Sequence, residues 1–115
     1  MAVKIYGIKN CDTMAKARRW LEARGVEAVF HDYKALGIEA LVLKGWADRI
    51  GWQKLINTSG QTFRKLPDED RADLDEAKAL RLMQAQPSMI RRPILDTGDQ
   101  LIAGFKPDIY ENVFK

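Results

Sequence analysis

The sequence has few of the side chains on which metal and disulfide chemistry depends. Among its 115 residues there is one cysteine, Cys11, and one histidine, His31. A single cysteine excludes a disulfide within the chain, and it excludes zinc clusters and iron–sulfur centres, which need several thiolates. A single histidine excludes histidine-rich metal sites, and a Cys–His arrangement would have to use His31 itself. We therefore expect no bound metal or cofactor.

Long apolar runs are missing as well. No stretch approaches the ~18 residues needed to cross a bilayer, and the first residues, Met1 to Tyr6, lack the apolar segment of a signal peptide. We expect a cytoplasmic protein without membrane contact. The net charge is +3, from 19 basic and 16 acidic residues, which is too small to predict direct nucleic-acid binding.

What is present is typical of a small globular protein. Hydrophobic residues make up 46% of the chain and charged residues 30%. A chain of this length forms one domain and buries a core without metals or cross-links. Nothing in the sequence indicates an interface between copies, so we expect a monomer.

The first third of the chain predicts a strand, a helix and a second strand. Residues 3–7 alternate between apolar and polar side chains, as in a short strand. Apolar residues at helical spacing follow over 12–24, and Gly25 is a typical helix stop. A second strand is expected within 27–33. Because a helix connects the two strands, they should be parallel, with a right-handed crossover.

The middle of the chain predicts helices. Residues 38–56 carry apolar side chains at helical spacing, and Gly51 divides them into two helices. A loop is expected at 58–62. A further helical stretch should begin at Pro67 and end before Pro87, with a break near Asp73.

The last part of the chain predicts a hairpin and a helix. Two short apolar runs flank the turn residues 96–99, and Pro107 opens a final helix. The order is βαβ, then helices, then ββα. We therefore expect an α/β, thioredoxin-like fold with a mixed four-stranded sheet. Its core would comprise 1–36 and 87–115, and a helical insertion, 37–86, would separate the second and third strands of this single domain.

Cys11 lies where the first strand gives way to the first helix. Unpaired backbone N–H groups and the positive end of the helix dipole stabilise a thiolate there, so its pKa should fall below the free value of about 8.5. Lys9 would add to this effect, and Asp12 would oppose it unless it caps the helix. The alternative is an unreactive, buried cysteine. The position at a strand-to-helix corner favours the reactive thiolate.

The residues after Cys11 limit its chemistry. A dithiol motif would need a second cysteine where Met14 stands, and a phosphatase-type loop would need an arginine where Ala17 stands. A monothiol mechanism remains, in which the thiolate attacks a disulfide or another oxidised substrate and an external thiol releases the product. Glutathione is the expected co-substrate, and as an anionic peptide it needs cations nearby.

The segment before the predicted hairpin supplies such cations. Arg92 precedes Pro93, which favours extended backbone, and their peptide bond is a candidate for the cis form. In a thioredoxin-like fold this segment packs beside the cysteine loop. We expect Arg92 to pair with a carboxylate or oxyanion, and the backbone around Pro93 to bind a peptide substrate. Arg91 is either a second binding residue or a solvated charge.

Two further features leave alternatives open or suggest structural roles. Residues 57–65 are rich in hydroxyl, amide and basic side chains, and they either cover the active site or form a plain connection. His31 falls within a predicted strand between Phe30 and Asp32, which favours a structural role over a catalytic one.

Four segments of the chain resemble the arsenate reductase (ArsC)/Spx family. They are GIKNCDT at 7–13, LINT at 55–58, FRKL at 63–66 and IRRPIL at 90–95. The resemblance covers essentially the whole chain and is nearest to the small bacterial YffB-type proteins. It implies a thioredoxin-like fold with a helical insertion, a bacterial source and glutathione-dependent thiol reduction.

The other branches of the family match less fully. Its arsenate reductases use one cysteine and three arginines; Cys11 and Arg92 match, but Asn57 and a position near Lys106 replace the other two, and lysine lacks the bidentate fork. Spx-type regulators bind RNA polymerase and carry a CxxC switch, which Met14 removes.

We therefore expect a glutathione-dependent thiol–disulfide oxidoreductase with Cys11 as nucleophile. Arsenate reduction and Spx-like polymerase binding are the alternatives. The expected partners are glutathione and a disulfide or oxidised substrate. The residues expected to bind them or to stabilise the thiolate are Lys9, Asn10, Thr13, Asn57, Arg91, Arg92 and Pro93.

Overall fold

A mixed four-stranded sheet forms one end of the molecule in the computed structural model, which describes residues 3–115. The strand order is β2-β1-β3-β4. The strands are β1 (Val3–Gly7), β2 (Ala28–Asp32), β3 (Ile94–Asp96) and β4 (Leu101–Ala103). Strand β1 pairs in parallel with β2, and the other two pairings are antiparallel. The α/β, thioredoxin-like fold expected from the sequence is confirmed.

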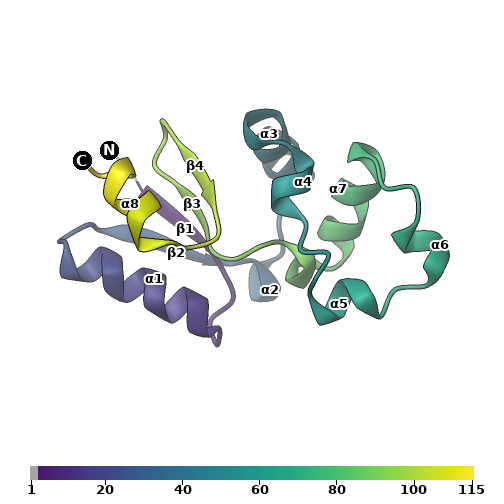
Figure 1. Ribbon diagram of the computed structural model, residues 1–115, viewed down its shortest axis with the longest axis horizontal. Coiled ribbons are helices and arrows are strands. Elements are labelled where there is room, and N and C mark those ends of the chain that lie inside the picture. The colour runs from purple at the N-terminus through teal and green to yellow at the C-terminus, as the bar shows by residue number, and fades with distance from the viewer. Residues whose placement is uncertain (1–2) are drawn as a thin grey trace.

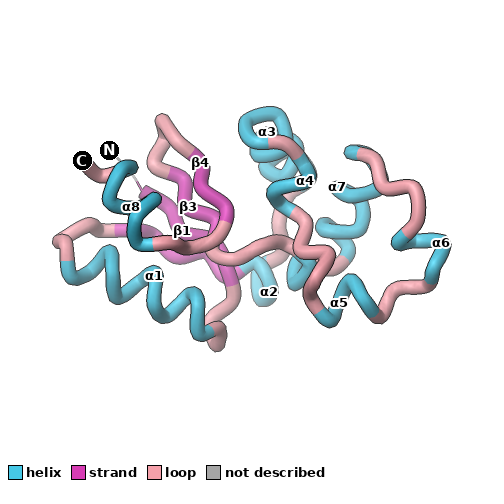
Figure 2. The backbone as a smooth tube through the Cα atoms, in the orientation of Figure 1, coloured by secondary structure: helices cyan, strands magenta, loops and turns pink. Residues whose placement is uncertain are grey.

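Helices flank the sheet and form the opposite end of the molecule (Figures 1 and 2). Helix α1 (Asp12–Ala23) connects the parallel strands, and α8 (Pro107–Val113) follows the hairpin. The elements between β2 and β3 are all helical: α2 (Tyr33–Leu36), α3 (Ala40–Ile50), α4 (Trp52–Leu55), α5 (Gln61–Arg64), α6 (Asp68–Arg71), α7 (Glu76–Ala85) and the 3₁₀ helix η1 (Pro87–Met89). None of the helices in residues 3–115 is long and apolar enough to span a bilayer.

Two apolar clusters cover the two faces of the sheet. Alternate residues of β1 point to opposite faces, so Ile5 packs into the cluster with Met14 of α1 and Tyr110 of α8. Tyr6 faces the other way, into the larger cluster that contains Trp46 of α3. The helices between β2 and β3 are thus joined to the sheet through a common core.

The structure shifts several of the expected boundaries. The second strand ends at Asp32 because the Asp32 carboxylate accepts the backbone N–H groups of Lys34 and Ala35 and so caps α2. The expected loop at 58–62 is shorter, since α5 begins at Gln61.

The other helix boundaries agree with the pattern of the sequence. Gly25 follows α1 with a positive φ of 70°, and Gly51 separates α3 from α4. Asp73 has a φ of 51° in the expected break between α6 and α7. The positive φ values of Gly25 and Asp73 are typical of residues that end helices.

The close approach of β1 to α1 generates a test of stability. A Cβ atom at Gly7 would collide with Sδ of Met14, which is 1% exposed. We expect Gly7→Ala to lower the free energy of unfolding by about 1 to 3 kcal/mol, because the buried Met14 side chain would have to shift within the core. Gly45→Ala is the matched control, since a Cβ there meets nothing within 4 Å and alanine stabilises a helix interior by about 0.5 to 1 kcal/mol. Urea unfolding measures both, and equal stability of the two variants would contradict this account.

Candidate active site

Cys11 occupies the N-cap position of α1, directly after the turn that leaves β1. Its backbone is extended, with φ −126° and ψ 128°, and its carbonyl accepts the N–H of Ala15 at 3.0 Å. Asp12 is therefore the first residue of the helix rather than its cap. The thiol lies at the end of a helix where backbone N–H groups have no partner within the helix.

The surroundings of Cys11 favour its thiolate. Partial burial raises the pKa of the thiol, but hydrogen bonds from the backbone of Met14 and Thr13, together with the hydrogen bond and positive charge of Arg92, lower it further than burial raises it. The net pKa lies below the ordinary cysteine value. The thiolate is the nucleophilic form, so this position suits thiol chemistry.

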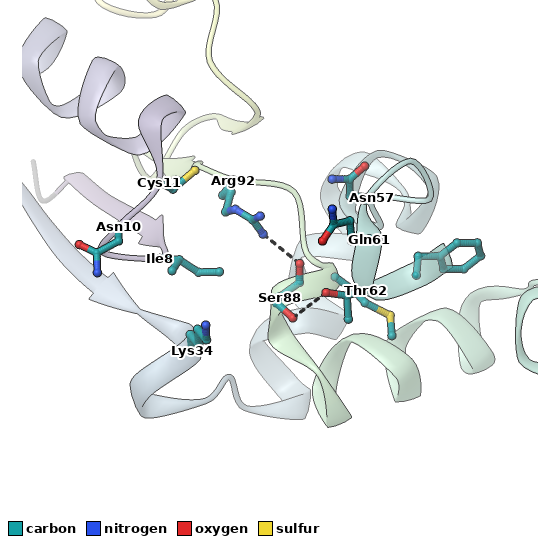
Figure 3. Close-up of a pocket in the computed structure, with 12 residues that line it drawn as sticks. Ile8, Asn10, Cys11, Lys34, Asn57, Gln61, Thr62, Ser88 and Arg92 are labelled. Carbon is teal, nitrogen blue, oxygen red and sulfur yellow. Dashed lines mark hydrogen bonds between the residues drawn. The ribbon is translucent and has the colours of Figure 1, made fainter. Parts of the chain in front are cut away.

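Arg92 is the cation beside Cys11. Its Nη1 donates to the carbonyl oxygen of Ser88 in η1 at 2.9 Å, and the side chain lies between Cys11 and Ser88 in Figure 3. A guanidinium has several N–H groups in one plane. One of them is held by Ser88, and the charge remains beside the sulfur.

Backbone hydrogen bonds fix the segment that carries Arg92. The N–H of Arg91 donates to the carbonyl of Leu55 at 2.7 Å, and the N–H of Asn57 donates to the carbonyl of Met89 at 2.8 Å. These two bonds join the end of α4 to the residues after η1 as a short antiparallel bridge. The Arg92–Pro93 peptide bond is cis, as the sequence predicts.

Tyr33 also holds the segment that carries Arg92 in place. Its side chain is fully buried, and its hydroxyl donates to the carbonyl of Ile90 at 3.0 Å, with a longer contact of 3.3 Å to that of Arg91. Burial is the main cause that raises the pKa of Tyr33 far above its usual value. Tyr33 therefore stays neutral and acts as a hydrogen-bond donor.

A cavity of about 420 Å³ opens beside Cys11 (Figure 3); we call it the cysteine cavity. Its lining combines residues from 8–11 directly after β1, from α2, from the segment 57–63 and from η1. The lining residues are Ile8, Asn10, Cys11, Lys34, Asn57, Gly60, Gln61, Thr62, Phe63, Ser88, Met89 and Arg92. Of the two roles left open for 57–65, covering the site is therefore the one that the structure supports.

A smaller pocket of about 200 Å³ also adjoins the sulfur; we call it the connecting pocket. Thr13, Arg91 and Gly104 line it together with Cys11, Asn57 and Arg92. The cysteine is thus approached through two adjacent hollows that share three residues.

The expected site residues divide between these hollows. Asn10, Asn57 and Arg92 line the cysteine cavity with Cys11, whereas Thr13 and Arg91 line the connecting pocket but not the cysteine cavity.

Two expected site residues lie outside both hollows. Lys9 is exposed and lines neither of them. Pro93 is buried, and its carbonyl already accepts the N–H of Gly104 at 2.8 Å. That carbonyl is thus already used within the fold.

Sequence reasoning did not identify Lys34, Ser88 or Tyr33 as site residues. Lys34 follows β2 closely, and Cys11 follows β1. Because β1 and β2 are parallel, the residues after them meet at one edge of the sheet. The predicted parallel pair was therefore a signal for Lys34. No comparable local signal marks Ser88, whose role is to accept from Arg92 through its backbone.

His31 has the structural role that the sequence favours. One of its ring nitrogens, Nε2, lies 3.0 Å from the carbonyl oxygen of Gly37, and its ring packs against Tyr6. It does not line the cysteine cavity.

Comparison with known proteins places the chain among close relatives. Residues 6–113 match the model of the ArsC family. The solved structure of a YffB protein is 53% identical, with a TM-score of 0.95, and the match covers 99% of this chain and 100% of that one. An arsenate reductase (ArsC) related protein from Brucella melitensis is 52% identical, with a TM-score of 0.79, over 100% of this chain and 96% of that one.

Curated relatives include proteins of different description. An uncharacterized protein from Haemophilus influenzae is 34% identical over 97% of this chain and 98% of its own length. The global transcriptional regulator Spx of Listeria innocua is 29% identical over 92% of this chain and 82% of its own length.

The geometry around Cys11 predicts how its pKa responds to mutation. Arg92→Ala removes a hydrogen bond and a positive charge that lower this pKa, so we expect the pKa to rise. The pH at which iodoacetamide alkylation reaches half its maximal rate should move upward, and alkylation at neutral pH should slow several-fold. Arg91→Ala removes the same charge from the neighbouring position and should leave the midpoint in place. Equal shifts in both variants would show that only the overall charge matters.

Proposed function

This chain belongs to the ArsC family, and we propose that it is a glutathione-dependent thiol–disulfide oxidoreductase with Cys11 as its single nucleophile. The observation that carries the proposal is a cysteine with a lowered pKa at the mouth of a cavity that also presents Arg92 and Lys34. Because the sequence has no second cysteine, an external thiol must complete the cycle.

The proposed reaction balances with two molecules of glutathione. The Cys11 thiolate attacks the glutathione sulfur of a mixed disulfide; the Cys11–glutathione S–S bond forms, the substrate S–S bond breaks, and the substrate leaves as a thiolate that takes up a proton. A second glutathione thiolate then attacks the bound glutathione sulfur. Oxidised glutathione leaves, and Cys11 returns as the thiolate. One glutathione is already part of the mixed disulfide, and the second enters to release Cys11. Together they supply the two electrons that reduce the substrate to its thiol, and they leave joined as oxidised glutathione.

The lining of the cysteine cavity suits glutathione. This tripeptide carries two carboxylates and several amide groups. Lys34 and Arg92 offer cations on two sides of the cavity, and Asn57 and Gln61 offer side-chain amides (Figure 3). A volume of about 420 Å³ lies within the usual range for a small-ligand site. Charge-assisted hydrogen bonds to carboxylates are the stronger kind, so the two cations should dominate recognition.

The alternatives find less support at this site. For arsenate reduction the family pattern has three arginines, but Asn57 lines the cavity in place of one, and Lys106 lines neither hollow beside Cys11. For an Spx-like switch the second cysteine would stand at Met14, whose side chain is 1% exposed in the cluster between the sheet and α1. The thiol-reductase proposal also places the protein in the cytoplasm, where reduced glutathione is available.

Intact mass measured after incubation with oxidised glutathione tests the nucleophile. We expect the parent chain to gain one glutathione below pH 7, because its thiolate is stabilised, and to lose it again with reduced glutathione. Cys11→Ser should gain none and should lose all glutathione-dependent reduction of a small mixed disulfide, while keeping the circular dichroism of the parent. Turnover that persists in Cys11→Ser would rule out Cys11 as the nucleophile. Reaction of the parent only above pH 8 would rule out an activated thiol.

A pair of lysine variants tests the binding cavity. Lys34→Ala removes a cation from the lining, and we expect the KM for glutathione to rise about two- to fivefold, the usual effect of an exposed ion pair. Lys9→Ala removes a lysine that is close to Cys11 in sequence but does not line the cavity, so the KM of this variant should match that of the parent. Steady-state kinetics at fixed ionic strength measure both. A larger effect of Lys9→Ala than of Lys34→Ala would reverse the assignment.

A further inference from the structure

A second, larger hollow lies beside β4, one of the two edge strands of the sheet. Its volume is about 620 Å³. We call it the β4 groove. Its lining includes β4, Ile50 of α3, Lys54 of α4, Phe105, and Ile109 of α8. Its lining is more apolar than that of the cysteine cavity, so it suits a different kind of ligand.

The β4 groove continues into the active site. Arg91 and Gly104 line both the β4 groove and the connecting pocket, and the connecting pocket is lined by Cys11. A molecule bound along the groove would therefore meet the cysteine on the side away from Lys34, which lines the cysteine cavity alone. The two sides of the sulfur thus have different surroundings.

Backbone groups at the free edge of β4 face outward. Gly104 donates to Pro93 at 2.8 Å, and Thr97 donates to Gln100 at 3.0 Å, so the hydrogen-bonded pairs of this antiparallel ladder alternate through Ile102 and Leu95. The N–H and C=O groups of Leu101 and Ala103 then point away from β3. Within residues 3–115 no strand pairs with that edge. Such an edge suits the addition of an extended peptide.

The charges around the groove have one sign. Lys54, Arg91 and Lys106 line it, and none of its described lining residues is acidic. Its apolar side chains include Ile109, which is 40% exposed. An acidic segment with apolar side chains complements this surface, whereas a small charged molecule would leave the apolar floor uncovered.

We propose that the β4 groove binds an extended, acidic segment of a polypeptide whose cysteine, held as a mixed disulfide with glutathione, is the substrate. This inference rests on the proposed function and names its substrate class. Glutathione would occupy the cysteine cavity and the polypeptide the β4 groove. The Cys11 thiolate attacks the glutathione sulfur, the polypeptide thiolate leaves along the groove, and a second glutathione restores Cys11 with release of oxidised glutathione.

Three substrates compare the groove with the cysteine alone. Two synthetic peptides carry the same glutathionylated cysteine, followed either by alternating acidic and apolar residues or by alternating basic and apolar residues. The third substrate is the mixed disulfide of glutathione and β-mercaptoethanol, which cannot reach the groove. We expect kcat/KM for the acidic peptide to exceed that for the basic peptide about tenfold.

Matched charge variants locate the effect. Lys54→Glu with Ile109→Glu changes the groove charge by −3, and Glu at position 109 is compatible with the first turn of α8. Arg81→Glu with Gln84→Glu makes the same change on exposed positions of α7. The first pair should abolish the preference for the acidic peptide and leave the β-mercaptoethanol substrate unaffected. The second pair should behave as the parent on all three substrates.

Binding measured without chemistry separates this proposal from the proposed function. A fluorescent acidic peptide with serine in place of cysteine should bind the parent and the Arg81→Glu, Gln84→Glu variant with equal affinity. It should bind the Lys54→Glu, Ile109→Glu variant about tenfold more weakly. Such binding without turnover of any substrate would reject the oxidoreductase and retain the groove. Equal kcat/KM for the acidic and basic peptides, or equal losses in both variants, would overturn the groove proposal. Tighter binding of a single-stranded oligonucleotide than of the acidic peptide would overturn it as well.

Discussion

Two backbone hydrogen bonds between distant segments hold the active site together. The bonds from Arg91 to Leu55 and from Asn57 to Met89 join the end of α4 to the segment that enters β3. One side of this short bridge carries Arg92 to Cys11, and the other brings Asn57 and the following polar residues over the cavity. Since both bonds lie among buried side chains such as Ile56 and Ile90, their loss would leave polar groups without partners in an apolar interior. The sheet supplies the cysteine, and the bridge supplies what surrounds it.

Both backbone groups and a side chain lower the pKa of Cys11. The backbone N–H groups at the start of α1 lower the pKa of Cys11 whatever side chains follow. Arg92 lowers it further, and its bond to Ser88 prevents the guanidinium from turning away. The fixed Arg92 cation therefore acts on the nucleophile and also faces the cavity, where the exposed Lys34 is the second cation.

A single cysteine has consequences for the rest of the surface. An enzyme with two cysteines resolves its own mixed disulfide, but under the proposed monothiol mechanism an external thiol must enter while the substrate is bound or after it has left. Two hollows share Cys11, and the proposal assigns the small thiol to one side of the sulfur and the departing substrate to the other. The buried Met14 shows that the fold has used the position of a second cysteine for packing.

Local patterns in the sequence determine much of this protein. The sequence shows the alternation in β1, the helical period of α1 and the turn before β4, because these patterns act between near neighbours. It also shows a lone cysteine at a strand-to-helix corner, from which the proposed monothiol chemistry follows. The tertiary structure decided which side chains share the cavity. Lys34 and Ser88 are included and Lys9 is excluded, because their positions follow from the parallel strand pair and from the bridge between Leu55 and Arg91. Such contacts join residues far apart in the chain, and no local period or cap records them.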